Sequence, residues 1–73
     1  MLNNHIYDLM EQVTEESKSL WRIKNKYIDD ATGHEDCTTF WRKLAQDKES
    51  HIENLTKLIE THIGNRPIIQ EYE

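Results

Sequence analysis

Two stretches, Leu20-Trp-Arg-Ile-Lys-Asn-Lys-Tyr27 and Phe40-Trp-Arg-Lys-Leu-Ala-Gln-Asp-Lys-Glu-Ser-His51, decide the fold of this 73-residue chain. In each stretch, and in the residues that flank it, apolar side chains recur at intervals of three and four residues, the spacing of one face of an α-helix. Only a short segment separates the two patterns. They therefore predict an all-α fold in which two long helices are joined by one turn.

The extent of the three- and four-residue spacing on either side of these stretches predicts where each helix begins and ends. A first helix covers about 3–31, a turn 32–36 and a second helix about 37–63, and a tail over 64–73 has no helical period. Gly33 lies just after the first helix, where glycine readily takes the left-handed conformation that ends a helix. We expect the tail to pack against the helices or to fray.

A turn of five residues places two helices side by side in opposite directions, as an antiparallel hairpin. If the turn is centred between Glu35 and Asp36, residues at the same level can be paired by counting outward from it. The expected pairs are Val13 with Leu58, Tyr27 with Leu44 and Leu20 with His51.

The chain forms one domain over 1–73, and this domain is small. A hairpin of this size buries little apolar area, so scaffolds of this kind usually need a disulfide, a metal or a partner subunit. Cys37 is the only cysteine and cannot form an internal disulfide. A reducing, cytoplasmic setting is therefore expected, and self-association is the expected source of additional stability.

The second helix carries two adjacent apolar stripes, one through Phe40, Leu44, Leu55 and Leu58 and the other through Trp41, Ala45, Ile52 and Ile59. One partner helix covers only one stripe. Two hairpins related by a two-fold axis would bury both in a four-helix bundle, although a trimer or a hetero-complex would also do so. The residues expected at the association surface are Trp41, Ala45, Ile52, Ile59 and Trp21.

Charge and hydropathy exclude two classes of partner. The net charge of −5 and the lack of a basic stripe argue against nucleic acid, which is bound largely through basic residues. No stretch of 18 apolar residues occurs, so a membrane span is not expected. We therefore expect protein partners, and first of all a second copy of the chain.

Tyr27 and Ala31, the pattern Phe40-Trp-x-x-Leu-Ala-x-Asp-x-x-x-His51, and Leu55 and Leu58 together resemble rubrerythrin and other ferritin-like proteins. The resemblance covers about residues 13–60. It implies half of a four-helix bundle, with a di-iron or di-manganese site of oxidase or peroxidase type. His51 corresponds to the family's histidine and Tyr27 to its tyrosine. The positions of the two glutamates hold Leu20 and Lys48.

Glu16 and His51 interrupt the apolar stripes and are the candidate metal ligands of this chain. Carboxylate and imidazole together suit iron, manganese or zinc. The alternative is that Glu16 and Lys48 reach the edge of the bundle while His51 forms a local hydrogen bond. His5 and His62 are expected near one end of the bundle, either as a zinc or nickel site or as solvated side chains.

Two functions follow from these patterns. The first is a small, non-catalytic helical interaction or structural module that forms a homodimer. The alternative is a ferritin-like protein that binds metal through a reduced Glu16 and His51 site. No catalytic residue is assigned, and enzymatic activity, of di-metal oxidase or peroxidase type, is expected only with the metal-binding function. The missing glutamates favour the non-catalytic module, because without bridging carboxylates little would hold two irons and activate oxygen or peroxide.

Overall fold

The structure is a computed structural model, and it describes residues 4–64. The elements are α1 (Asn4–Arg22), a short π-helix (Ile23–Tyr27), α2 (Ile28–Asp30) and α3 (Glu35–Gly64). The predicted all-α class is confirmed, since the described part of the chain contains helices and no strand. The expectations for the tail fall on 65–73, outside the described residues.

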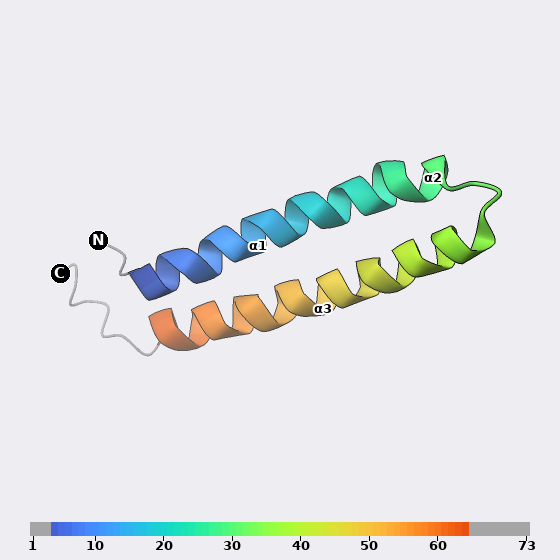
Figure 1. Cartoon of the computed structure of the whole chain (residues 1–73). Helices are drawn as coiled ribbons and strands as arrows, with labels where there is room; N and C mark the ends of the chain where they lie inside the picture. Colours follow the sequence, from blue (N-terminus) through green and yellow to red (C-terminus); the bar gives the residue numbers. More distant parts are fainter. Residues whose placement is uncertain (1–3, 65–73) are drawn as a thin grey trace.

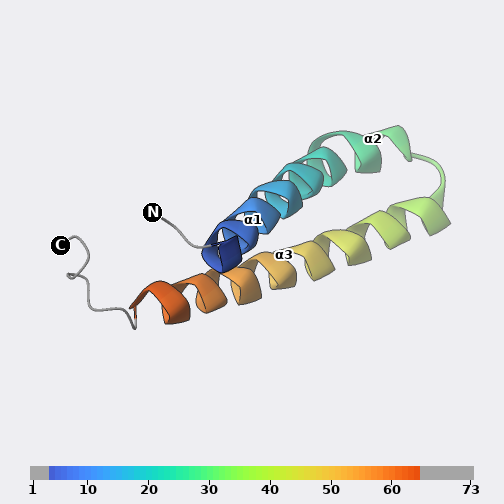
Figure 2. The ribbon, with the colours of Figure 1, turned by 60° about the vertical axis from the view of Figure 1, so that its left-hand side comes forward.

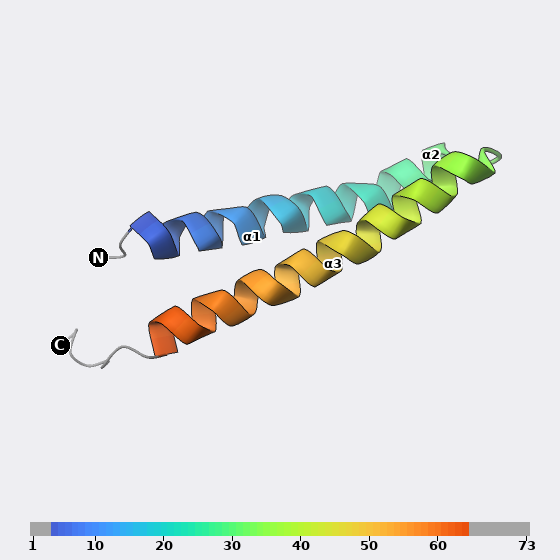
Figure 3. The same ribbon diagram turned by 60° about the horizontal axis from the view of Figure 1, so that its bottom comes forward.

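The first three elements form one continuous rod. Arg22 and Ile28, which flank the π-helix, both have α-helical backbone angles, so the chain does not break there. In Figures 1 and 3, α1 lies alongside α3 and runs in the opposite direction, with the turn at one end. Figure 2 shows that the two rods cross at an angle rather than lying parallel.

The π-helix compensates for a difference between the spacing of three apolar residues and the repeat of an α-helix. Ile23 and Ala31 are buried and Tyr27 between them is half-buried, and the three are separated by intervals of four. An α-helix repeats every 3.6 residues, so two successive intervals of four would drift round the helix. The wider π turn, with hydrogen bonds from residue i to i+5, compensates this drift. The three side chains therefore stay on the face toward α3.

The turn covers Ala31 to His34, and Gly33 has φ of +94°, as predicted for the residue that ends the first helix. The His34 carbonyl accepts hydrogen bonds from the backbone N–H of Thr38, at 3.0 Å, and from its hydroxyl, at 2.8 Å. These bonds start α3 at Glu35, two residues before the expected position. The turn is therefore shorter and lies earlier in the chain than expected.

Because the turn lies earlier, the expected register is wrong by about one helical turn. The ring of Tyr27 contacts Trp41, with centroids 4.9 Å apart, instead of lying level with Leu44. His51 contacts Glu16 instead of lying level with Leu20. In both pairs the observed partner lies three or four residues earlier in the chain than the expected one. The shift is similar because both expected pairs were counted from a turn centre that was placed too far along the chain.

Substitution of Gly33 by alanine tests the turn directly. No atom lies within 4 Å of the position that a Cβ would occupy, so the cost comes from backbone conformation alone. We expect Gly33→Ala to lower the free energy of unfolding by about 1 kcal/mol, measured by urea denaturation. Gly33→Asn should cost less, since asparagine tolerates this conformation better. Equal stability of wild type and Gly33→Ala would contradict the assignment.

Candidate functional site

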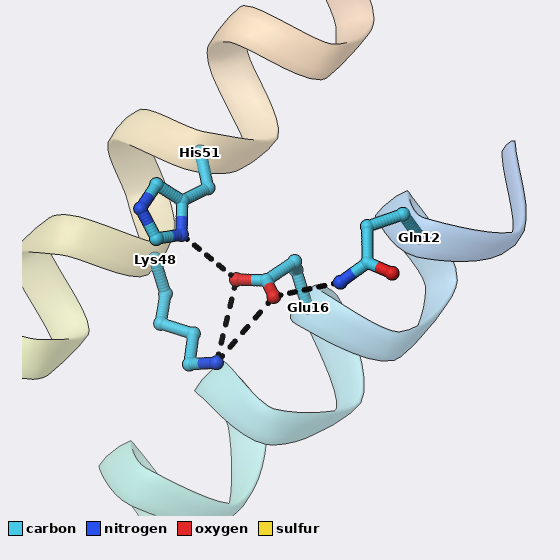
Figure 4. A network of polar contacts seen from close by, with 4 residues as sticks. All are labelled: Gln12, Glu16, Lys48 and His51. Carbon is cyan, nitrogen blue, oxygen red and sulfur yellow. Dashed lines mark hydrogen bonds and ion pairs between the residues drawn. The ribbon is translucent and has the colours of Figure 1, made fainter. Parts of the chain in front are cut away.

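The two candidate ligands face each other across the helices. Glu16 projects from α1 and His51 from α3, and Figure 4 shows their side chains meeting between the two ribbons. The Nδ1 atom of His51 lies 3.1 Å from Oε1 of Glu16. A carboxylate accepts hydrogen bonds only, so Nδ1 carries the proton in this contact. The structure thus brings together residues that are 35 positions apart in the sequence.

Lys48 and Gln12 complete a network round the same carboxylate (Figure 4). The ammonium group of Lys48 lies 3.4 Å from Oε1 and 3.5 Å from Oε2 of Glu16. The amide of Gln12 donates to Oε2 at 3.0 Å. Both oxygens of Glu16 therefore have partners, and three side chains hold one carboxylate in place.

This network is partly shielded from water. The side chains of Glu16 and Lys48 are 12% and 19% exposed, whereas His51 is more than half exposed. Burial by itself raises the pKa of Glu16, because it penalises the charged form. The hydrogen bonds from His51 and Gln12, together with the positive charge of Lys48, outweigh burial and lower this pKa below its usual value. Glu16 is therefore a carboxylate at neutral pH.

The residues round Glu16 do not fit a divalent metal within one chain. Lys48 brings a positive charge to the carboxylate that a cation would need, and it would have to be displaced. Among residues 4–64, no group of three or more His, Cys, Asp or Glu side chains is placed to hold an ion. The arrangement is instead that of an ion pair between helices, reinforced by two hydrogen bonds.

The residues expected at the association surface differ in their exposure. Ala45 is buried within the single chain and is only 6% exposed, which leaves little of its surface for a partner. Trp41 is half-buried and contacts the rings of Tyr27 and Phe40. Ile52 and Ile59 are also half-buried, and Trp21 is largely exposed. For these four residues, a place at an interface stays a prediction.

The structure exposes the other stripe of α3 more strongly. Phe40 is 59% exposed, Leu58 is also exposed, and Leu44 and Leu55 between them are half-buried. We call these four residues the apolar stripe. A hollow of about 420 Å³ adjoins its far end, lined by Leu55, Leu58, His51, Asn54, Gln12 and Glu16. A smaller hollow, of about 200 Å³, adjoins Phe40.

Sequence reasoning missed the role of Gln12 and did not establish which stripe faces α1. Gln12 precedes Glu16 by four residues, the spacing at which two side chains on a helix can interact, so a signal was present. The pairing of Glu16 with Lys48 was not predicted, since the alternative interpretation placed both side chains at the edge of the bundle. The choice between stripes depends on how α3 is rotated about its own axis, and periodicity does not reveal this angle.

Comparison with known proteins gave no relative. No family model, curated protein or solved structure matches this chain. Within residues 4–64, no helix is long and apolar enough to cross a membrane.

Proposed function

We propose that this chain is a non-catalytic helical interaction module that pairs with a second copy through the apolar stripe of α3, forming a four-helix bundle. The observation that carries the proposal is the exposure of Phe40 and Leu58, two large apolar side chains on one face of α3. They lie about five helical turns apart, with the half-buried Leu44 and Leu55 between them on the same face, and apolar faces of this kind can serve as interaction surfaces.

The small core supports the need for a partner. Within residues 4–64, the buried apolar side chains are Ile6, Ile23, Ala31 and Ala45, and two of these are alanines. Burial of a large aliphatic side chain contributes only about 1.5–3 kcal/mol, while ordering of each residue costs about 1–2 kcal/mol. A second hairpin would cover the apolar stripe and add the missing buried area.

The order of residues along the stripe favours a second copy over an unrelated partner. Centred near residue 49, the face contains Phe40 and Leu44 on one side and Leu55 and Leu58 on the other, at similar distances. A two-fold axis near residue 49 would therefore place Phe40 opposite Leu58 of the partner subunit, and Leu44 opposite Leu55 of the partner subunit. An isologous interface requires such self-complementarity.

Charge and shape on the same face agree with this arrangement. Asp47 and His51 lie two residues to either side of the proposed axis. The carboxylate of Asp47 would therefore face the imidazole of His51 of the partner subunit, rather than a second carboxylate. The exposed Phe40 ring would enter the hollow beside Leu55 and Leu58 of the partner subunit, and the symmetry repeats this contact. Aromatic side chains seated in such hollows dominate the binding energy of many interfaces.

A ferritin-like metal-binding role is the second proposal, and the contact between Glu16 and His51 is the observation that favours it. It is the weaker of the two, since Lys48 already neutralises the carboxylate. Iron, manganese or zinc would require rearrangement of this network and ligands from a second copy. A chelator-treated sample that takes up no metal at Glu16 and His51 would remove this proposal.

Phe40→Asp tests the proposed dimer. We expect sedimentation equilibrium to show a dimer of the wild type at micromolar concentration and a weakening of at least about 30-fold in Phe40→Asp. Loss of one hot-spot residue costs about 2 kcal/mol or more, which corresponds to about 30-fold in the dissociation constant, and the second copy of the residue in a symmetric interface adds to this loss. Tyr7→Asp is the matched control, because Tyr7 is 56% exposed but lies on α1, outside the apolar stripe.

A wild-type monomer at 100 micromolar (roughly a hundred times a 1 micromolar dissociation constant) would overturn the proposal. Equal disruption by Tyr7→Asp and Phe40→Asp would place the interface elsewhere. If Phe40→Asp does not fold, the milder Phe40→Ala should lower the melting temperature at a given protein concentration and move its concentration dependence to higher concentrations, as mass action requires of a weakened dimer. Circular dichroism distinguishes a folded monomer from an unfolded chain.

A further inference from the structure

Two histidines from opposite ends of the described chain meet at the open end of the molecule. His5 lies near the start of α1 and His62 near the end of α3, and their ring centroids are 4.7 Å apart with the ring planes at 86°. Both side chains are exposed to solvent. The contact lies at the end of the rods away from the turn (Figure 1).

This separation is compatible with one metal ion shared by the two rings. A divalent transition metal binds an imidazole nitrogen at about 2.0–2.1 Å, and the ring centroid lies roughly 1.2 Å beyond that nitrogen. Two imidazoles on one ion, at angles between about 90° and 109°, therefore have centroids about 4.5–5.2 Å apart. The observed 4.7 Å falls within this range, so the two rings are close enough for one ion to be bound by a nitrogen of each.

We propose that His5 and His62 bind one divalent transition metal ion, of the Zn²⁺, Ni²⁺ or Cu²⁺ class, and that this ion fastens α1 to α3. Imidazole is a ligand that suits these metals, and water completes the coordination at an exposed position. Hard ions such as Mg²⁺ and Ca²⁺ prefer oxygen ligands and are excluded. The pair belongs to a single chain, so the site does not depend on the proposed dimer.

The position of the site determines its effect. At the other end of the rods the turn already joins the two helices, whereas within residues 4–64 no covalent link joins them at the open end. An ion held by both helices stabilises the folded state by mass action, because it binds this state in preference to the unfolded chain. The chain would therefore be most stable when metal is present, and its open end would respond to metal concentration.

The test is a thermal and calorimetric titration of untagged, chelator-treated protein with ZnCl₂ and NiCl₂. We expect one ion per chain and a rise in melting temperature of about 5–10 °C at ten times the dissociation constant, with no rise in MgCl₂. His5→Gln and His62→Gln should each abolish the rise. His34→Gln, at the turn, and His51→Gln, at the Glu16 network, are matched controls that should retain it.

Several outcomes would overturn the proposal. These are no rise in the wild type, a rise that survives both His5→Gln and His62→Gln, and a rise that only His51→Gln removes, which would place the ion at Glu16. Should the substitutions prevent folding, NMR of the wild type replaces them. Substoichiometric Cu²⁺ should broaden the ring signals of His5 and His62 before those of His34 and His51, and the reverse order would contradict the site.

Discussion

Ile23→Ala is expected to lower the melting temperature by about 10 °C or more, the largest effect of any single substitution considered. Ile23 is 1% exposed and lies in the π-helix that keeps the first rod against α3. Truncation of a buried isoleucine to alanine usually costs about 2–5 kcal/mol, and each kcal/mol lowers the melting temperature of a domain of this size by about 4–8 °C. Loss at this position removes a major part of a small core.

Ile28→Ala is the matched control, because it makes the same chemical change five residues later at a half-buried position. Alanine favours helix formation to the same degree in both variants, so this contribution cancels in the comparison. Ile28→Ala should therefore cost clearly less than Ile23→Ala in the same thermal scan. Equal losses would show that Ile23 does not have the central role that its burial indicates.

Glu16→Gln is expected to lower the free energy of unfolding at pH 7 by about 1–3 kcal/mol. The change keeps the shape of the side chain but removes the charge that pairs with the largely buried Lys48. Removal of one partner leaves the other charge poorly compensated, which costs more than the pair itself contributes. Urea denaturation followed by circular dichroism measures the difference.

Glu49→Gln is the control for this substitution. Glu49 also forms an ion pair between α3 and the first rod, with the ammonium group of Lys24 at 2.7 Å, but both side chains are about half exposed. Exposed pairs contribute about 0–1 kcal/mol, so this variant should be close to the wild type. If the two glutamine variants lose equal stability, burial of the Glu16 network has no special importance.

Acid should remove the contribution of Glu16, and the direction follows from its pKa. The pKa of this carboxyl is lower in the folded state than its usual value of about 4.3, so the folded state favours the ionised form. The resulting stability is fully present above the usual pKa and is lost as the pH falls through the lower, folded value. The stability difference between wild type and Glu16→Gln should therefore be largest near neutral pH and narrow below about pH 4. A difference that stays constant down to pH 3 would contradict this role.

Self-association and metal binding would each stabilise a hairpin whose own core is small, but by different means. The proposed dimer would cover the apolar stripe along α3, whereas the proposed ion would join His5 and His62 at the open end. The two are separable, because Phe40→Asp leaves both histidines in place and His5→Gln leaves the stripe in place. A metal-dependent rise in melting temperature that persists in Phe40→Asp would show that they act independently.

Local patterns in the sequence were enough to predict the helices and the residue that ends the first one. Apolar side chains at intervals of three and four predicted the all-α class, and Gly33 was predicted to take the left-handed conformation that it has. The interruption of the apolar face by Glu16 and His51 marked the two residues that the structure joins at 3.1 Å. These properties depend on neighbours along one helix, where spacing translates directly into position.

Only the tertiary structure decided how the two rods meet. The start of α3 at Glu35 moved the register by about one turn, and this shift placed Glu16 beside Lys48 and His51. The π-helix at Ile23–Tyr27 and the rotation of α3 then determined that Ala45 is buried while Phe40 is exposed. By itself the sequence determined two amphipathic helices and a turn. Their register and rotation depend on packing between residues that are distant in the chain, which the periodicity of either helix alone does not encode.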